Sequence, residues 1–179
     1  MEENPIIPAI MPQSFEDIRE HVERVAGQVS TVQLDIMDGE FVPEATWPYG
    51  GGQRLEVGSW NQLQEQEVGL PFWEEIDYEL DLMVQDADKR LDEWIALGPK
   101  RIIFHLEALD NVVELLEKAQ GARSLVEIGL AIDSATPVGD LFPHLEMIDC
   151  VQLMGIARIG YQGEPFDESV LDQIGRAHV

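Results

Sequence analysis

The stretch VQLDIMDGEFVP, residues 32–43, decides the fold and also raises the question of function. Successive side chains of an extended strand point to opposite faces. The aliphatic residues of this stretch therefore share one face, and Gln33, Asp35 and Met37 share the other. Asp38, just beyond the strand, is expected to shape a turn by binding local backbone amides. The stretch thus predicts a strand with one apolar face and one face that carries polar groups.

Short aliphatic runs of this kind recur along the chain, with helical patterns between them. We expect strands at residues 6–11, 31–37, 78–84, 101–107, 125–132 and 149–155. We expect helices from Ser14 to the stop signal at Gly27, near 86–97, near 110–120, and from Thr136 and Pro137 onward. Residues 44–74 are rich in glycine and irregular, and we expect a long loop there with one short helix or a hairpin.

The alternation of strands and helices predicts a parallel sheet with helical cover, either doubly wound or closed into a barrel. Central strands of a doubly wound sheet are buried on both faces and should be apolar on both. Here one face is aliphatic and the other is mixed, small or charged, which favours a barrel with polar residues converging inside. The later strands recur about every 25 residues. We therefore expect an α/β fold, a (β/α)8 TIM barrel of which about six βα units are present.

The last six residues, IGRAHV at 174–179, resemble translated sequencing-adapter DNA. We expect them to be a non-native read-through tail and residues 1–173 to form a single truncated barrel domain. The alternative interpretation is an ordinary helix tail. On the first interpretation, the last two βα units of the barrel would lie beyond this chain.

The composition limits the classes of partner. Thirty-five acidic residues against 11 basic ones give a net charge of −24, which opposes binding to nucleic acid or to an anionic membrane. No apolar run reaches the ~18 residues of a membrane span, and the acidic N-terminus lacks the basic start of a signal peptide. One cysteine, Cys150, fits a reducing compartment. We expect a cytoplasmic protein.

Catalytic groups of barrels lie at the carboxyl ends of the strands. The inward residues expected there are Asp35, Met37, Asp81, Met83, His105, Glu107, Gln152 and Met154. Apolar surroundings can raise the pKa of a carboxylate until it becomes a useful base, and methionines can cover a planar intermediate and exclude water. The set therefore suggests proton abstraction next to a carbonyl. The alternative is that the methionines fill barrel layers and the acids are partly solvated.

The chain resembles the ribulose-phosphate 3-epimerase family along nearly its whole length. The matching pieces are IIPAIMPQSFEDI, VQLDIMDGEFVP, ELDLMV, IIFHLEAL, GLAIDSATP and VQLMGIARIGYQGEPFDESVLDQI. The resemblance implies a barrel that interconverts ribulose 5-phosphate and xylulose 5-phosphate through an enediolate, with a divalent metal and aspartates on the second and seventh strands. Asp35 matches the first aspartate. Met37, Met83 and Met154 match the methionine cap over the intermediate.

Several positions depart from the pattern of that family. Ala9 stands where the family has a serine, and Gln33 and Asp81 stand where it has metal-binding histidines. The aspartate of the seventh strand would lie beyond the chain. The remaining candidate ligands, Gln33, Asp35 and Asp81, offer only oxygen, which suits Mg²⁺ or Mn²⁺ better than Zn²⁺ or Fe²⁺. Either the metal has changed or it has been lost.

The phosphate-binding end is altered as well. The glycine-rich loop of the family corresponds to residues 159–166, where Gly160 and Gly163 would let backbone amides face a phosphate. Glu164 would repel an anion if it pointed inward, and Arg158 could compensate, although a solvated loop arginine is the simpler interpretation. His105 is expected to face the substrate or to be a hydrogen-bonded core residue.

We therefore expect an epimerase acting on a phosphorylated ketopentose, with Asp35 as base. The full-length protein could form a homo-oligomer, and the 179-residue chain alone is expected to be inactive. One alternative is a non-catalytic phosphosugar-binding barrel that has lost its metal. Another is a related sugar-phosphate isomerase or decarboxylase, because fold alone does not fix the reaction.

Overall fold

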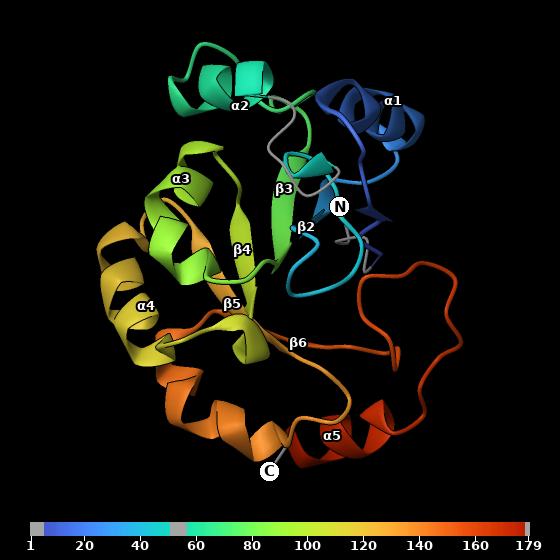
Figure 1. Ribbon diagram of the computed structural model, residues 1–179, viewed down its shortest axis with the longest axis vertical. Coiled ribbons are helices and arrows are strands. Elements are labelled where there is room, and N and C mark those ends of the chain that lie inside the picture. The colour runs from blue at the N-terminus through green and yellow to red at the C-terminus, as the bar shows by residue number, and fades with distance from the viewer. Residues whose placement is uncertain (1–5, 51–56, 178–179) are drawn as a thin grey trace.

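A computed structural model describes residues 6–50 and 57–177 of the chain (Figure 1). Its strands form one six-stranded sheet. The strands are β1 Ala9–Ile10, β2 Thr31–Met37, β3 Asp77–Met83, β4 Arg101–His105, β5 Glu127–Ile132 and β6 Cys150–Leu153. All six lie within the predicted strands or within one residue of them.

The strand order distinguishes the two architectures. The strands are arranged β1-β2-β3-β4-β5-β6, and each pair of neighbours is parallel. A doubly wound sheet reverses its strand order at a switch point, and this sheet does not. The fold is therefore α/β with the sequential order of a (β/α)8 barrel, as predicted. Within the described residues β1 and β6 form the two edges of the sheet.

Helical segments connect the strands. The α-helices are α1 Phe15–Val25, α2 Val57–Gln64, α3 Leu91–Ala96, α4 Val112–Ala119 and α5 Val170–Ala177, and the 3₁₀ segments are η2 Ala87–Arg90, η3 Leu106–Ala108, η4 Gln120–Ala122 and η5 Val138–Met147. Helices α3 and α4 lie along one side of β4 and β5, and α5 lies beside β6 (Figure 1). None of the helices in the described part of the chain is both long and apolar enough to cross a bilayer.

Helix α1 begins as the sequence predicts. The Ser14 hydroxyl accepts a hydrogen bond from the backbone N–H of Asp17 at 3.0 Å, which satisfies one of the free donors at the helix start. The Asp17 carboxylate accepts from the backbone N–H of Gln13 at 2.9 Å. Gly27 follows the helix with a φ of +76°, a conformation that glycine adopts without strain. Local sequence alone therefore determines both ends of this helix.

Strand β1 is shorter than predicted, because prolines bracket it. Pro8 and Pro12 lack the N–H that a ladder requires, so only Ala9 and Ile10 pair as strand. The proline carbonyls still accept hydrogen bonds, from Gln33 at 2.9 Å and Trp47 at 2.7 Å. The chain is therefore hydrogen-bonded to β2 at Pro8 and to the segment after β2 at Pro12.

The helix predicted from Thr136 and Pro137 is a 3₁₀ segment. Segment η5 begins at Val138 and contains Pro143. A proline inside a helix removes one backbone donor and clashes with the preceding turn, which disfavours a regular α-helix here. A helical segment is therefore present, but it begins at Val138, and Pro137 is its cap rather than its first residue.

Helix α5 extends into the predicted tail. It runs to residue 177, while residues 178–179 lie outside the described part of the chain. Gln173, at the predicted boundary, is buried and donates hydrogen bonds to the carbonyl oxygens of Asp133 at 3.0 Å and Thr136 at 2.9 Å. The domain boundary at residue 173 stays a prediction.

The two faces of the sheet differ as predicted. The outward residues pack with the helices in one continuous apolar core, whose central members Leu34, Leu82, Phe104 and Leu130 are fully buried. The inner face carries Gln33, Asp35, Asp81, His105 and Gln152, which contact one another. Burial of the outer face supplies the main stabilising term, and the polar side chains gather on the inner face.

Candidate functional site

Two carboxylates lie side by side on the inner face of the sheet. Asp35 of β2 and Asp81 of β3 are register partners in the parallel ladder, so their side chains leave neighbouring strands at the same level. Asp81 is only 1% exposed. A buried carboxylate beside a second, half-buried one requires hydrogen-bond donors or a cation close by.

Gln33 supplies such a donor. Its Nε2 donates to Asp35 Oδ1 at 3.2 Å and to Asp81 Oδ2 at 3.0 Å. Gln33 lies two residues before Asp35 on the same face of β2, so its side chain can approach both carboxylates. The amide nitrogen of Gln33 therefore bridges the carboxylates of two neighbouring strands.

His105 and Gln152 complete the contacts of Asp81. His105 Nε2 lies 3.1 Å from Asp81 Oδ1, and Gln152 Nε2 donates to Asp81 Oδ2 at 2.8 Å. His105 is fully buried, and its Nδ1, which lacks a hydrogen-bond partner, is 4.0 Å from a carboxylate oxygen of Glu107. The structure thus joins Gln33 to four of the predicted inward residues, which come from β2, β3, β4 and β6.

The surroundings change the acidity of this cluster. Burial, and then the charge of Asp81, raise the pKa of Asp35 to about 8, while the hydrogen bond from Gln33 opposes the rise. Burial on its own would lower the pKa of His105, but the charge and hydrogen bond of Asp81 outweigh it and raise that pKa. A carboxyl group with a pKa near 8 can gain and lose a proton close to neutral pH. Asp35 therefore has the acidity that a general base requires.

Apolar side chains pack together at the carboxyl ends of β2 and β3. Met37 and Met83 form a buried group with Val42, and Phe41 and Ile159 pack against it. Met154, the third predicted methionine, is not in this group. Its Sδ lies 3.4 Å from Nε2 of Gln152. Two of the three methionines thus lie together at the carboxyl ends of β2 and β3, and the third lies beside Gln152.

The loop after β6 reaches across to β2. Gly160 has a φ of +84°, and a Cβ built on it would lie 3.0 Å from Val42 and 3.4 Å from the sulfur of Met37. Gly163 also has a positive φ, of +77°, and its surroundings are open. The Glu164 carboxylate lies 3.8 Å from the Arg158 guanidinium. The acidic residue of the loop therefore has a positive partner beside it, and a phosphate-binding role for Gly160 and Gly163 stays a prediction.

Asp38 has the structural role expected from the sequence. Its Oδ1 accepts hydrogen bonds from the backbone N–H groups of Glu40 at 2.8 Å and Phe41 at 3.0 Å. Its Oδ2 accepts one from Gln85 at 2.7 Å, on the loop after β3. Asp38 therefore holds two loops at the mouth of the site and is separate from the Asp35 cluster.

Two residues that support the site were not predicted. Thr46, in the segment expected to be irregular, is fully buried, and its hydroxyl donates to the carbonyl oxygen of Asp35 at 2.8 Å and accepts from the N–H of Met37 at 2.9 Å. A threonine in a loop gives no periodic signal. The second is Arg101 at the start of β4, which binds Glu79 and Glu127, each at 2.6 Å, one layer below the carboxylates.

Most oxygens of the two predicted carboxylate ligands are already engaged in hydrogen bonds. The oxygens of Asp81, and one oxygen of Asp35, already accept hydrogen bonds from nitrogen. Among the described residues no group of three or more His, Cys, Asp or Glu is placed to hold a metal ion. A divalent metal stays a prediction from the sequence, and the arrangement of these residues does not fit it.

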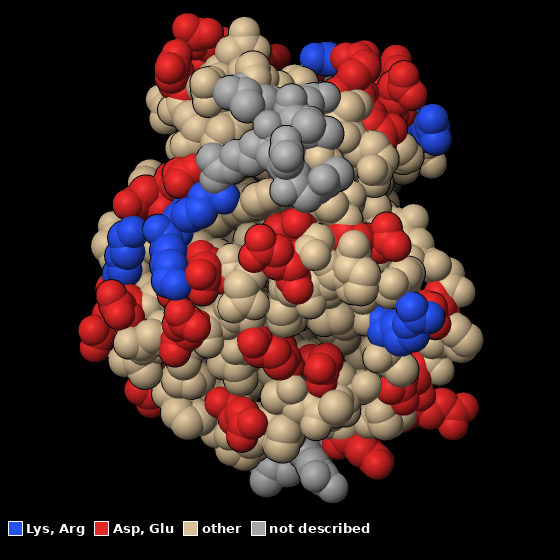
Figure 2. All heavy atoms as spheres, viewed as in Figure 1, with Lys and Arg blue, Asp and Glu red and all other residues tan. Residues whose placement is uncertain are grey.

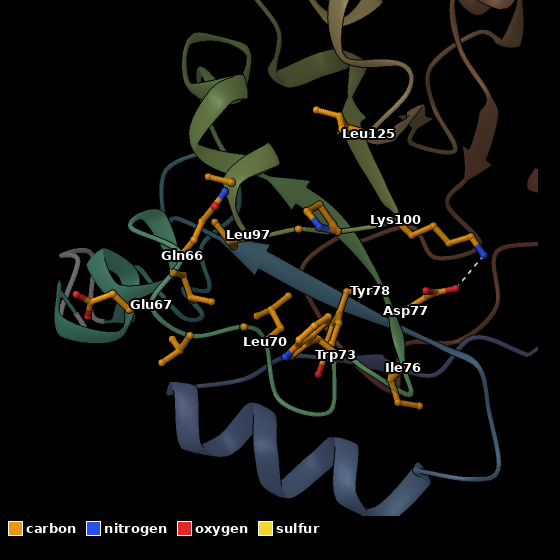
Figure 3. Close-up of a pocket in the computed structure, with 16 residues that line it drawn as sticks. Gln66, Glu67, Leu70, Trp73, Ile76, Asp77, Tyr78, Leu97, Lys100 and Leu125 are labelled. Atoms are coloured by element: carbon orange, nitrogen blue, oxygen red, sulfur yellow. Dashed lines mark hydrogen bonds and ion pairs between the residues drawn. The ribbon is translucent and has the colours of Figure 1, made fainter.

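A cavity of about 760 Å³ lies at the opposite end of the strands (Figure 3). Trp73 and Leu70 line it near the start of β3, and the Lys100–Asp77 ion pair, at 3.0 Å, lies on its rim. This is the amino end of the strands, where barrels carry stabilising residues rather than catalytic ones. The cavity therefore does not belong to the carboxylate cluster.

The surface surrounding these features is acidic. Figure 2 shows carboxylates spread over the visible face, with basic side chains in a few small groups. This distribution follows from the net charge of −24. An anionic substrate would therefore have to be held by local backbone amides or by a few basic groups rather than by the overall field.

The strands are parallel and sequential, and carboxylates lie near their carboxyl ends. These two features are typical of α/β barrel enzymes, which carry their acid–base groups at that end of the strands. The chain belongs to the ribulose-phosphate 3-epimerase family, whose family model matches residues 5–179.

Curated relatives agree with this family assignment. The chain is 27% identical over 177 residues to ribulose-phosphate 3-epimerase of Escherichia coli K12, covering 97% of this chain and 70% of that protein. It is 26% identical over 170 residues to the enzyme of the same name from Schizosaccharomyces pombe, covering 94% and 68%. The protein of that name from Mycobacterium tuberculosis H37Rv is 25% identical over 180 residues, with 94% and 66% covered.

Proposed function

We propose that this protein is an isomerase that epimerises a phosphorylated ketopentose, interconverting ribulose 5-phosphate and xylulose 5-phosphate. Family membership supports the substrate class. The observation that carries the proposal is Asp35, a carboxyl group at the carboxyl end of β2 whose pKa is raised to about 8 by burial and by Asp81. A cytoplasmic location and a homo-oligomeric state stay predictions.

The proposed chemistry begins at Asp35. Its carboxylate removes the proton from the carbon next to the substrate carbonyl, and the electron pair of that C–H bond forms the carbon–carbon double bond of an enediolate. Negative charge then develops on the former carbonyl oxygen. Return of a proton to the opposite face gives the epimer and requires a second acid. The resemblance to the family places that acid on a seventh strand.

Other residues would support this step. Met37 and Met83, which pack together in a buried apolar group, would keep water from a planar intermediate. His105, held by Asp81, offers an imidazole nitrogen near the carboxylates. Gly160 and Gly163 would let backbone amides bind the phosphate. Met154 would cover the intermediate from the side of Gln152.

Proton exchange tests the proposal more directly than turnover, because it requires only one of the two acids. Ribulose 5-phosphate is incubated with the protein in D₂O, and loss of the C3 proton signal is followed by NMR. We expect exchange, and Asp35→Asn should slow it at least about 100-fold, the usual contribution of a general base. Asp92→Asn, a matched change of an exposed carboxylate on α3, should leave the rate unchanged. Exchange that does not depend on Asp35 would reject the proposed role.

A non-catalytic role in phosphosugar binding is the second candidate. It is favoured by Gln33 and Asp81, which stand where the resemblance to the family implies metal-binding histidines, and by the hydrogen bonds that already engage the carboxylates. This candidate predicts saturable binding of the sugar phosphate without any deuterium exchange. A related isomerase or decarboxylase would instead convert a different sugar phosphate, with Asp35 still required.

A further inference from the structure

The space between the two carboxylates is already filled by a side chain. Nε2 of Gln33 lies 3.2 Å from Asp35 Oδ1 and 3.0 Å from Asp81 Oδ2. A Mg²⁺ ion shared by the same two oxygens would lie about 2.1 Å from each. The amide hydrogens of Gln33 point into that space, so the amide and the ion exclude each other.

The orientation of the amide follows from its partners. A primary amide has two N–H donors on nitrogen and only an acceptor on oxygen. The reversed orientation would direct the Gln33 oxygen at the oxygens of Asp35 and Asp81, and Asp81 would then receive no donor from Gln33. Only the nitrogen side can satisfy both Asp35 and Asp81, which determines the orientation of the amide.

Two further side chains contact Asp81, one at the oxygen that Gln33 also contacts and one at the other oxygen. Gln152 donates to Oδ2 at 2.8 Å, and His105 lies 3.1 Å from Oδ1. A cation at Asp81 would have to displace these two groups in addition to Gln33. Asp81 is 1% exposed, so water could not replace the displaced donors without reorganising the site.

We propose that Gln33 takes the place of a divalent cation in this site, joining Asp35 to Asp81 through its amide, and that the site formed by the described residues binds no divalent metal ion. Gln33 is then a positioning residue, because it orients the carboxylate of Asp35. The positioning role of Gln33 in catalysis rests on the proposed function. The absence of metal binding is independent of that function.

Metal titration tests the inference without any sugar. The 179-residue chain, treated with EDTA and dialysed, is titrated calorimetrically with Mn²⁺, Mg²⁺ and Zn²⁺. We expect no saturable binding of any of them below about 1 mM. Gln33→His places an imidazole beside Asp35 and Asp81. This variant should bind Mn²⁺ or Zn²⁺ at least tenfold more tightly than the unaltered chain does. Gln62→His, the same change at an exposed position of α2, should not.

Two results would overturn the inference. One is 1:1 binding of a divalent metal by the unaltered chain that Asp35→Asn abolishes, and the other is a folded Gln33→His variant that binds metal no better than the Gln62→His control. Because the sugar exchange assay is separate, failure of the proposed function leaves this result unaffected.

A second measurement avoids any dependence on how the variants fold. In ¹H–¹⁵N spectra of the unaltered protein, the side-chain NH₂ of Gln33 should exchange with solvent at least tenfold more slowly than that of Gln62. Addition of Zn²⁺ to about 1 mM should leave that signal in place. Fast exchange of the Gln33 amide, or loss of its signal on addition of the metal, would contradict the proposed bridge.

Discussion

Asp35 and Asp38 belong to the same short stretch and differ in every contact. Asp35 faces the inner side of β2 and meets Gln33, whereas Asp38 accepts three hydrogen bonds from backbone amides of two loops. The difference follows from position, because Asp35 is inside a strand and Asp38 is one residue beyond it. One aspartate is therefore available for chemistry, and the other is fully occupied by structure.

The raised pKa of Asp35 predicts a pH dependence of the exchange reaction. Only the carboxylate form removes a proton, and the pKa of Asp35 is about 8. We expect the exchange rate in D₂O at limiting sugar phosphate to rise about tenfold per unit below pH 8 and to level off above it. A rate that levels off near pH 5 would show that Asp35 titrates normally or is not the base.

The same pKa predicts the effect of Asp35→Asn on stability. The folded chain holds a proton on Asp35 up to about pH 8, whereas the unfolded chain releases it near the ordinary value of 3.8. Asp35 therefore contributes stability at low pH that is lost as the pH rises from about 4 to about 8. We expect Asp35→Asn to unfold at higher urea concentration than the unaltered chain, with a difference that grows between pH 5 and pH 9. A constant difference would contradict the shift.

At the residue scale, alternation predicts which side chains converge but not how they bond. The inward positions of Gln33, Asp35 and Asp81 followed from strand parity. The bridge of Gln33 did not, because it depends on a rotamer and on a carboxylate 48 residues away in the sequence. Thr46 was missed for a similar reason, since its partners lie on β2.

At the element scale, the sequence was most informative where side chains act locally. Strand β2 has the predicted bounds of 31–37, and α1 begins directly after its predicted cap, Ser14. Helix α2 lies within the predicted irregular segment. The structure departs from the predicted bounds at β1 and η5, where prolines withhold backbone donors. Local rules therefore predicted the elements well, and proline effects on their bounds were underestimated.

The cap of α1 gives a prediction at this scale. Ser14→Ala removes the acceptor for the Asp17 N–H and should lower the free energy of unfolding by about 1 kcal/mol. Ser14→Asp keeps an acceptor at the same place and should restore most of the loss. Urea denaturation followed by circular dichroism measures both. Equal stability of all three proteins would show that the cap contributes nothing.

At the scale of the whole molecule, the sheet has two edges. Within the described residues β1 and β6 each pair on one side only. Val151 on β6 is 38% exposed, and Phe166, in the loop that follows, is 60% exposed. Unpaired edges with apolar side chains readily pair with other chains. The parity argument predicted the sequential sheet, because an inner polar face is characteristic of a barrel.

These edges predict the behaviour of the 179-residue chain in solution. We expect concentration-dependent self-association in sedimentation velocity experiments. Val151→Lys, which places a charge on the β6 edge, should reduce it several-fold. Val113→Lys, at a similarly exposed position of α4, serves as the control and should not. A monomer at all concentrations would contradict the expectation.

The sequential strand order also has a consequence for how the chain acquires its structure during synthesis. Each strand pairs with the one made just before it, so pairing can follow the ribosome from β1 onward without waiting for distant segments. Gln33, Asp35, Asp81 and His105 come from β2, β3 and β4 and can meet as soon as β4 has emerged. Gln152 on β6 joins last. Most of the acid–base cluster would therefore form early in translation, and the hydrogen bond from Gln152 to Asp81 would complete it later.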